Sequence, residues 1–293
     1  MSSVSRLTLI SVPFHLGVRG VGMGGGPLAL LDEGALPARL RVAGHDVEMA
    51  EVGEPSGESE IARVFEIDCE LAEAISGARA RGQDPLIISG NCNVCLGAIG
   101  GAGGERLGIV WLDAHPDFHT PETTDSGFLD GMGLAIATGA CWRTLAGTIP
   151  GFHAVEERDA ILVGVRDIDP AERKRLDSGE VSVIEGGGGP GSLPIGDLRA
   201  SLDDIMPRVD GVYLHLDLDS LDPSLGRANE YATDGGLGVD DVRAVVSAVA
   251  ERVPVRAASF TAYNPDVDPE REFLATAVDA IEVAVQASLA ASR

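Results

Sequence analysis

The most constraining feature of the sequence is an apolar run, Leu107 to Leu112, that is followed at once by alternating polar residues. A short apolar run with β-branched residues is typical of a strand buried on both faces of a parallel sheet. Side chains two residues apart in extended chain point the same way, so we expect Asp113, His115 and Asp117 to converge at the end of this strand. These polar side chains would be unfavourable in a hydrophobic core, but together they could bind a metal ion. A turn whose acidic residues are exposed to solvent would also explain them.

A second strand-like segment, Gly211 to Asp219, ends in the same way. Two buried strands with acidic ends are hard to explain by solvated turns, because buried carboxylates without a cation are costly or protonated. Together the two ends supply enough oxygen and nitrogen ligands for two divalent ions with a bridging carboxylate, and such oxygen-rich sites suit Mn²⁺. Two ions that share one water can turn it into a hydroxide nucleophile. The ligands expected from the two ends are Asp113, His115, Asp117, Asp217 and Asp219.

Strand-like and helix-like segments alternate along the rest of the chain. This alternation predicts βαβ units in a mainly parallel sheet, with ligands bound at the carboxyl ends of the strands. The glycine-rich segment 15–27 is expected to form a structural or substrate-rim loop, because its spacing does not fit a dinucleotide-binding fingerprint. No repeat or linker interrupts the pattern, so residues 1–293 are expected to form one domain. Strands are expected at 7–12, 47–52, 84–89, 107–113, 160–166, 181–184, 211–219 and 254–261, and helices at 28–40, 60–81 and 270–290.

Charge and cysteine content limit the partners and the location. The chain has 22 basic and 46 acidic residues, a net charge of −24, which disfavours nucleic acid and anionic membranes. Its four cysteines lack the spacing of a disulfide framework, so a reducing cytoplasm is expected. The N-terminal residues contain no signal-like apolar region, and Asp279 and Glu282 mark the last apolar stretch as a packing helix. A small molecule is therefore the expected partner.

Several segments, taken together, resemble the arginase/agmatinase, or ureohydrolase, family. Residues 113–117, Asp-Ala-His-Pro-Asp, resemble its Asp-Ala-His-x-Asp, and residues 215–223 resemble its Ser-x-Asp-x-Asp-x-x-Asp-Pro, followed by Gly-Gly-Leu at 235–237. Residues 164–172 resemble a strand and loop that help to hold the substrate's amino end. The resemblance implies a three-layer α/β/α sandwich with eight mostly parallel strands, two Mn²⁺ ions per chain, and trimers or hexamers.

One departure from the family pattern concerns a metal ligand. Cys92 stands where the family's Gly-Gly-Asp-His-Ser places a histidine. A thiolate at this position would shift the preference from Mn²⁺ towards Zn²⁺ or Fe, whereas an unligated thiol would leave the site weakened or empty. A similar cysteine, and a similar Thr-Pro-Glu-Thr-Thr-Asp run at 120–125, occur in the hydroxyarginine amidinohydrolase of cycloserine biosynthesis, a branch of the family. That branch keeps the guanidinium-binding glutamate, so its substrate does not carry over.

The other departures concern the substrate. Phe128 replaces an asparagine that contacts the amino acid's carboxylate in arginases, and Asp130 replaces a histidine thought to shuttle protons. Aspartate can do this near neutral pH only if burial raises its pKa from about 3.9. Ala262 stands where a glutamate grips the guanidinium, and loss of such a clamp costs about 2–4 kcal/mol. Substitute carboxylates for that grip are Glu122, Asp125 and Glu230.

The sequence thus predicts a binuclear, metal-dependent hydrolase that cleaves a C–N bond of a guanidino- or amidino-type linear substrate. Asp217 or Asp117 would accept the proton of the attacking water, and Asp130 would protonate the leaving amine. The alternatives are a non-catalytic or weakly active member with a degenerate metal site, and a mononuclear zinc amide hydrolase. The expected metal ligands are Cys92, Asp113, His115, Asp117, Asp217 and Asp219, and the expected substrate contacts are His119, Phe128, Asp169 and Ala262.

Overall fold

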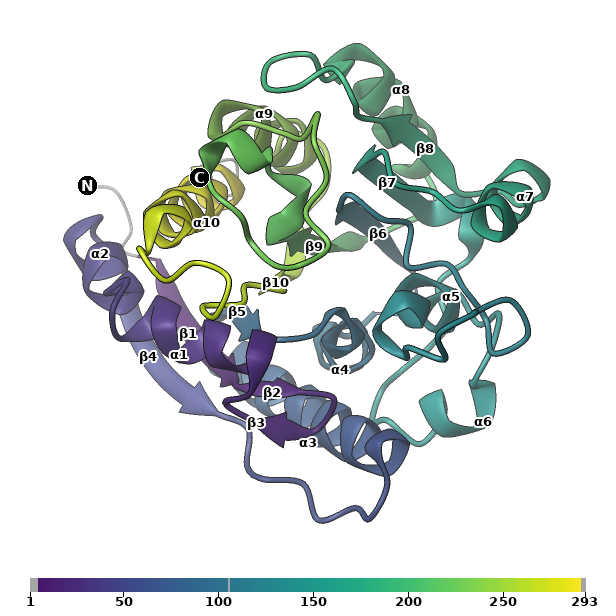
Figure 1. Cartoon of the computed structure of the whole chain (residues 1–293). Helices are drawn as coiled ribbons and strands as arrows, with labels where there is room; N and C mark the ends of the chain where they lie inside the picture. The colour runs from purple at the N-terminus through teal and green to yellow at the C-terminus, as the bar shows by residue number, and fades with distance from the viewer. Residues whose placement is uncertain (1–4, 105, 291–293) are drawn as a thin grey trace.

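A sheet of eight strands runs through the centre of the protein, as the computed structural model shows for residues 5–104 and 106–290 (Figure 1). The strand order is β4-β1-β5-β10-β9-β6-β7-β8, and every neighbouring pair is parallel. Each strand predicted from the sequence is present, which confirms the predicted α/β fold with an eight-stranded sheet. The strands are β1 (Arg6–Val12), β4 (Asp46–Glu51), β5 (Asp84–Ser89), β6 (Leu107–Leu112), β7 (Ala160–Val165), β8 (Ser182–Glu185), β9 (Gly211–Asp217) and β10 (Val255–Thr261).

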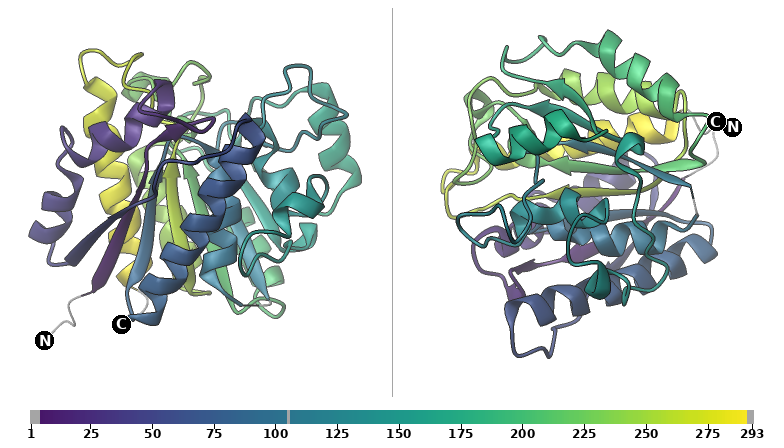
Figure 2. Two further views of the ribbon diagram at one scale, coloured as in Figure 1. Left: turned by 90° about the horizontal axis from the view of Figure 1, so that it is seen from below. Right: turned by 90° about the vertical axis from the view of Figure 1, so that its right-hand side faces the viewer.

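Helices cover both faces of the sheet, and the right-hand view of Figure 2 shows the sheet between them. Alternate strand residues face opposite layers: Val110 and Leu112 of β6 pack in one core, and Ile109 and Trp111 in the other. The layer on the Val110 side contains α1 (Gly25–Leu31), α2 (Leu36–Val42), α8 (Ile195–Ile205), α9 (Val239–Ala250) and α10 (Glu272–Ala290). The other layer contains α3 (Glu60–Ala80), α4 (Cys95–Ala102), α5 (Gly133–Ala137), α6 (Arg143–Ala146) and α7 (Pro170–Ser178).

The single helix predicted for residues 28–40 is wrong, because the structure divides this segment into α1 and α2. The chain turns at Gly34 and Ala35, and Ala35 has a left-handed backbone with φ of 49°. A side chain at Gly34 would lie 2.8 Å from the carbonyl oxygen of Leu30 and from Val278 of α10. The close packing of this turn against α10 therefore stops a helix that the apolar pattern would have continued.

The glycine-rich segment packs against the loop that follows β5. A Cβ atom on Gly90 would lie 2.8 Å from the Cα atom of Gly24, so the two backbones approach too closely for side chains. Gly24 belongs to a short 3₁₀ helix, η1 (Gly22–Gly24), that precedes α1. The segment thus has a structural role, and it also brings Met23 to the wall of the cavity described below.

The carboxyl ends of the four central strands, β5, β10, β9 and β6, lie side by side. Neighbouring parallel strands that end at the same edge bring the residues after them together. Cys92 opens the short helix η2 (Cys92–Val94) after β5, Asp113 directly follows β6, Asp217 ends β9, and Thr261 ends β10. No helix of the described chain has the length and apolar character needed to cross a membrane.

Candidate metal centre

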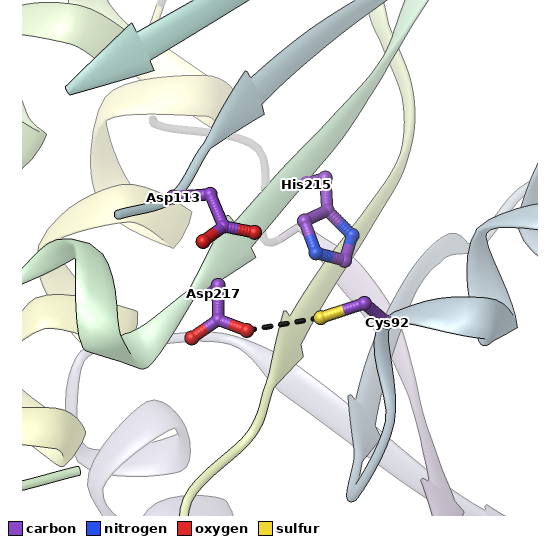
Figure 3. Close-up of side chains that lie close together, drawn as sticks. All are labelled: Cys92, Asp113, His215 and Asp217. Carbon is purple, nitrogen blue, oxygen red and sulfur yellow. Dashed lines mark hydrogen bonds between the residues drawn. The ribbon is translucent and has the colours of Figure 1, made fainter. Parts of the chain in front are cut away.

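Four side chains from three segments converge where β5, β6 and β9 end (Figure 3). They are Cys92, Asp113, His215 and Asp217, all buried, and their ligand atoms lie within 4.8 Å of one another. The Sγ atom of Cys92 lies 2.9 Å from Oδ2 of Asp217. His215 and Asp217 are two residues apart on β9, so the strand's alternation directs both towards the same side. The set combines sulfur, nitrogen and oxygen donors.

A second group shares one member with the first. It consists of Asp113, His115 and Asp219. Nδ1 of His115 lies 3.4 Å from an oxygen of Asp113 and 3.4 Å from an oxygen of Asp219. Because Asp113 belongs to both groups, its carboxylate would be available to cations at both positions. The arrangement fits a pair of neighbouring metal positions.

A cavity of about 120 Å³ adjoins both groups. A larger surface hollow of about 570 Å³, among residues 136–180, contains none of the grouped side chains, so chemistry rather than size singles out the smaller cavity. Asp117 lines the cavity but belongs to neither group. The other lining residues include Met23, Phe128, Asp130, Asn229, Tyr231 and Ala262.

The site carries an excess of negative charge. Burial raises the pKa of Asp113 to about 6, and desolvation and neighbouring carboxylates raise the pKa values of Asp117 and Asp217 well above their usual range. Although burial opposes both effects, the pairing of His115 with Asp219 raises the pKa of His115 to about 12 and lowers the pKa of Asp219. One imidazolium does not balance this many carboxylates, and divalent cations would do so.

Asp130 lies against the loop that carries Cys92. Its carboxylate accepts hydrogen bonds from Nδ2 of Asn91 and, at 3.0 Å, from the backbone N–H of Asn93. Burial raises the pKa of Asp130 to about 7, even though these hydrogen bonds act in the opposite direction. A carboxyl group with this pKa can exchange a proton near neutral pH, which an exposed aspartate cannot do efficiently.

His215 is the buried imidazole of the first group. Its Nδ1 atom lies 2.8 Å from the Tyr213 hydroxyl and 3.0 Å from Oγ of Ser259, and its Nε2 atom lies 3.3 Å from Oγ1 of Thr261. The ring stacks on Trp111 with a centroid separation of 3.7 Å. Burial lowers the pKa of His215 to about 3, so the imidazole is neutral.

The loop after β9 is held by two charged side chains. Asp222 accepts hydrogen bonds of 2.8 Å from the backbone N–H groups of both Gly235 and Gly236, which joins the Asp-Pro and Gly-Gly-Leu segments seen in the sequence. The guanidinium of Arg166 donates to the backbone carbonyl of Asp219 at 2.8 Å and to that of Thr233. These bonds fix the backbone from which Asp219 projects.

His119 and Asp169 contact each other, and neither is among the residues that line the cavity. Nε2 of His119 lies 2.7 Å from Oδ2 of Asp169 and 3.8 Å from Oε2 of Glu172. The other oxygen of Asp169 caps the first turn of α7 by accepting hydrogen bonds from Ala171 and Glu172. Substrate contact by His119 and Asp169 stays a prediction.

Comparison with known proteins agrees with this geometry. The sequence model of the Arginase family matches residues 5–289. The chain belongs to the arginase family.

Individual relatives and solved structures match this chain over most of their length. The arginase of Bacillus caldovelox is 29% identical over 290 residues, which cover 93% of this chain and 95% of that protein. The solved structure of Entamoeba histolytica arginase in complex with L-ornithine has a TM-score of 0.84 at 23% identity, covering 97% of this chain and 99% of that one. Formimidoylglutamase from Bacillus subtilis has a TM-score of 0.72 at 15% identity, covering 99% and 89%. These structures share the arginase fold with this chain.

Two expected substrate contacts, Phe128 and Ala262, line the cavity of this arginase-family protein. The Phe128 ring lies 6.0 Å from the ring of Tyr231 and 6.2 Å from that of His15, which makes an aromatic rim. Ala262 is buried and has a left-handed backbone, with φ of 64°. Asn229 donates to its carbonyl oxygen at 2.9 Å and to Asp219 at 3.1 Å.

The three carboxylates considered as substitutes for a guanidinium-binding glutamate do not line the cavity. Glu122 and Asp125 are exposed in the loop before Phe128. Glu230 is also exposed, and it accepts a hydrogen bond of 2.6 Å from Asn264. Glu230 follows a lining residue directly, so it is the best placed of the three for contact with a bound ligand.

The sequence interpretation of this arginase-family site missed several lining or adjoining residues. His215 was recognisable, because it alternates with Asp217 and Asp219 along one strand. Asn229, Tyr231 and Met23 carry no local signal, since they come from loops whose position depends on the folded sheet. Thr261 lies between Cys92 and His215, at 3.3 Å from each, only because β10 is the neighbour of β9.

Proposed function

We propose that this protein is a metal-dependent hydrolase that cleaves a C–N bond of a small, linear guanidino- or amidino-type substrate. The observation that carries the proposal is the pair of ligand groups that share Asp113 beside one cavity. The membership in the arginase family supports the same reaction class. Fold alone would not, because one fold can host many activities.

The donor atoms present fit divalent metal ions. Asp113, His115 and Asp219 offer oxygen and nitrogen ligands suited to Mn²⁺, and Cys92 adds a thiol that admits Zn²⁺ or Fe at the neighbouring position. When bound, such ions would lower the pKa of a water molecule and polarise the carbon under attack. Their charge would also keep the buried carboxylates ionised. We therefore propose two metal ions per chain, with Mn²⁺ at the oxygen-rich position.

Proton movements fall to three aspartates that line the cavity. Asp117 adjoins the ligand groups and Asp217 belongs to the first of them, so either carboxylate can accept the proton of the attacking water. Asp130 lines the cavity from the segment between β6 and α5, and hydrogen bonds from Asn91 and Asn93 hold its carboxyl group in place. We assign Asp130 the donation of a proton to the leaving amine, which general acid catalysis requires.

The cavity walls favour a flat cationic head group. Phe128 and Tyr231 line the cavity beside its acidic residues, and a guanidinium or amidinium can lie over an aromatic ring. Ala262 leaves space where a carboxylate would be needed to clamp the guanidinium of free arginine. Arginine is therefore expected to be a poor substrate. An analogue that carries an apolar group at the end opposite the guanidinium, in contact with the aromatic rim, is expected to be a better substrate.

The proposal extends to assembly and location. The family resemblance implies a homotrimer or homohexamer. All four cysteines are free, which suits a reducing cytoplasm. Size-exclusion chromatography with light scattering would measure the assembly directly, and a monomer at micromolar concentration would contradict this part.

The decisive experiment is turnover by protein loaded with Mn²⁺, with Zn²⁺ or with both. Arginine, hydroxyarginine, agmatine and formimidoylglutamate are supplied as substrates, and urea, ammonia and formamide are measured. We expect product from at least one substrate, and a loss of about 100-fold or more in kcat for Asp130→Asn. Asp125→Asn, which changes an exposed acid of the same loop, is the matched control and should retain activity. Absence of product from every substrate with fully loaded protein would refute the proposed reaction.

A further inference from the structure

His215 occupies a place on the sheet that directs it into the first ligand group. On β9 it lies between Tyr213, whose side chain packs in the α3–α7 core, and Asp217, a member of that group. Its register partners are Trp111 on β6 and Ser259 on β10. Both neighbouring strands therefore fix the position of the imidazole from the sides, and the alternation of β9 fixes its direction.

The two ring nitrogens have different surroundings. Nδ1 is engaged by the Tyr213 hydroxyl at 2.8 Å and by Ser259 at 3.0 Å. Nε2 is the nitrogen on the side of Cys92 and Asp217, as Figure 3 shows. A histidine that binds metal through one nitrogen is usually held through the other by a hydrogen bond to a neighbouring group. His215 has this arrangement before any metal is considered.

The surrounding contacts hold the site rigid. Trp111 stacks on the His215 ring, and its indole N–H donates to Oδ2 of Asp113 at 2.9 Å. The same buried side chain thus orients two members of the group, the imidazole and the shared carboxylate. Rigid support of this kind fixes ligand positions to the accuracy that metal binding demands.

We propose that His215 is a metal ligand, and that with Cys92, Asp113 and Asp217 it forms a four-donor site selective for Zn²⁺ or Co²⁺ over Mn²⁺. This inference rests on the metal centre of the proposed function and specifies one of its two positions. Cysteine sulfur, histidine nitrogen and carboxylate oxygen are all ligands of four-coordinate zinc, whereas Mn²⁺ prefers oxygen ligands. The neighbouring group of Asp113, His115 and Asp219 keeps the oxygen-rich character. The centre would therefore hold two different metals: Zn²⁺ or Co²⁺ in the group that contains Cys92, and Mn²⁺ in the group that contains His115 and Asp219. Asp113 belongs to both groups.

A different role for His215 would leave a different signature. The Thr261 hydroxyl lies 3.3 Å from Nε2 of His215 and 3.3 Å from Sγ of Cys92, so these three groups can also form a hydrogen-bonded chain without metal. In that case Thr261→Val would disturb the site as much as a change of His215. If His215 is a ligand, Thr261→Val should leave the metal in place, because valine keeps the shape of threonine and removes only the hydroxyl.

The test uses Co²⁺ as a spectroscopic probe on the full chain. Bound Co²⁺ reports a thiolate ligand by a near-ultraviolet charge-transfer band, and reports tetrahedral geometry by intense visible bands. Titrations are run on the unchanged protein, on His215→Gln, on Thr261→Val and on His153→Gln, an exposed histidine outside the site. Circular dichroism and thermal unfolding check that each variant is folded. Competition with Zn²⁺ then gives the relative affinities.

We expect a thiolate band and tetrahedral visible bands in the unchanged protein, in Thr261→Val and in His153→Gln. In His215→Gln the affinity should fall by more than about 100-fold, since loss of a ligand exceeds the 10–100-fold effect typical of an outer hydrogen-bond partner. An unaltered affinity and spectrum in His215→Gln would overturn the inference. So would the absence of a thiolate band from the unchanged protein, or an equal loss in Thr261→Val.

A measurement on the unchanged protein removes any dependence on the folding of the variant. X-ray absorption spectroscopy of protein saturated with zinc gives the number of sulfur ligands and the number of imidazole ligands per zinc ion. Two imidazoles and one thiolate per two zinc ions are expected, from His115, His215 and Cys92, whereas one imidazole per two ions would overturn the inference. Neither experiment measures turnover. A protein that shows these ligands but hydrolyses nothing would refute the proposed function and leave the assignment of His215 standing.

Discussion

Removal of metal is expected to lower the thermal stability of this protein by an amount that can be stated in advance. The acids of the two ligand groups are buried and face a single imidazolium, His115, so their mutual repulsion opposes folding. A cation that binds only the folded chain adds about 2.7 kcal/mol to the free energy of unfolding at a free concentration 100 times its Kd. For 293 residues, an unfolding entropy of about 2.1 cal/mol/K per residue converts this to a rise in Tm of about 4 °C for each site.

The assay is differential scanning calorimetry of protein stripped by a chelator and then titrated with Mn²⁺, Zn²⁺ or both. Asp113→Asn is the informative variant, because Asp113 is common to both ligand groups. It should abolish most of the metal-induced rise and, by removing a buried charge, raise the Tm of the metal-free protein. Asp240→Asn changes a fully exposed acid and should alter neither value.

The same titration has a pH dependence with a definite sign. Burial raises the pKa of Asp113 to about 6, so at pH 5 a proton occupies the carboxylate in the metal-free protein and must leave when a cation binds. The metal-induced rise in Tm should therefore be smaller at pH 5 than at pH 8. A rise that is equal at both pH values, or that survives in Asp113→Asn, would refute the assignment of these groups to a metal centre.

Two further predictions concern groups outside the ligand set. Asp68 on α3 is buried, with one oxygen bonded to the N–H of Gly97 at 3.0 Å and the other without a hydrogen-bond partner among the described residues. Burial raises the pKa of Asp68 in the folded protein well above the usual range. The contribution of Asp68 to the free energy of unfolding is therefore lost as the pH rises above the pKa that this residue has in the unfolded chain. Asp68→Asn should raise the free energy of unfolding at pH 8 by about 1–3 kcal/mol and leave it nearly unchanged at pH 4, by urea denaturation; a loss of stability at pH 8 would contradict this. Arg166→Lys cannot reproduce the bonds of the guanidinium to the Asp219 and Thr233 carbonyls, so it should lower the free energy of unfolding by about 2–4 kcal/mol and weaken metal binding. The control Arg173→Lys, in an exposed ion pair with Glu185, should cost under about 1 kcal/mol, and equal costs for the two changes would show that the carbonyl contacts of Arg166 contribute little.

The local pattern of apolar and polar residues predicted the strands correctly but failed for the helix predicted at residues 28–40. Buried parallel strands are short apolar runs, so β6 and β9 could be placed within a residue or two from their sequences alone. The break between α1 and α2 was missed because the turn at Gly34 depends on contact with α10, a helix from the other end of the chain. Sequence patterns report the periodicity of an element but not the distant element against which it packs.

For the site, the sequence by itself determined which residues stand at the ends of β6 and β9, because alternation in a strand is a local property of the backbone. It thereby determined that Asp113, His115, Asp217 and Asp219 are available to metal. Only the tertiary structure decided how they divide, since the division depends on the order of strands in the sheet. That order places Cys92 after β5 and His215 on β9 within reach of the same point, and it places Asp113 where the two groups meet. No periodicity along the chain contains this information, because it arises from contacts between segments far apart in sequence.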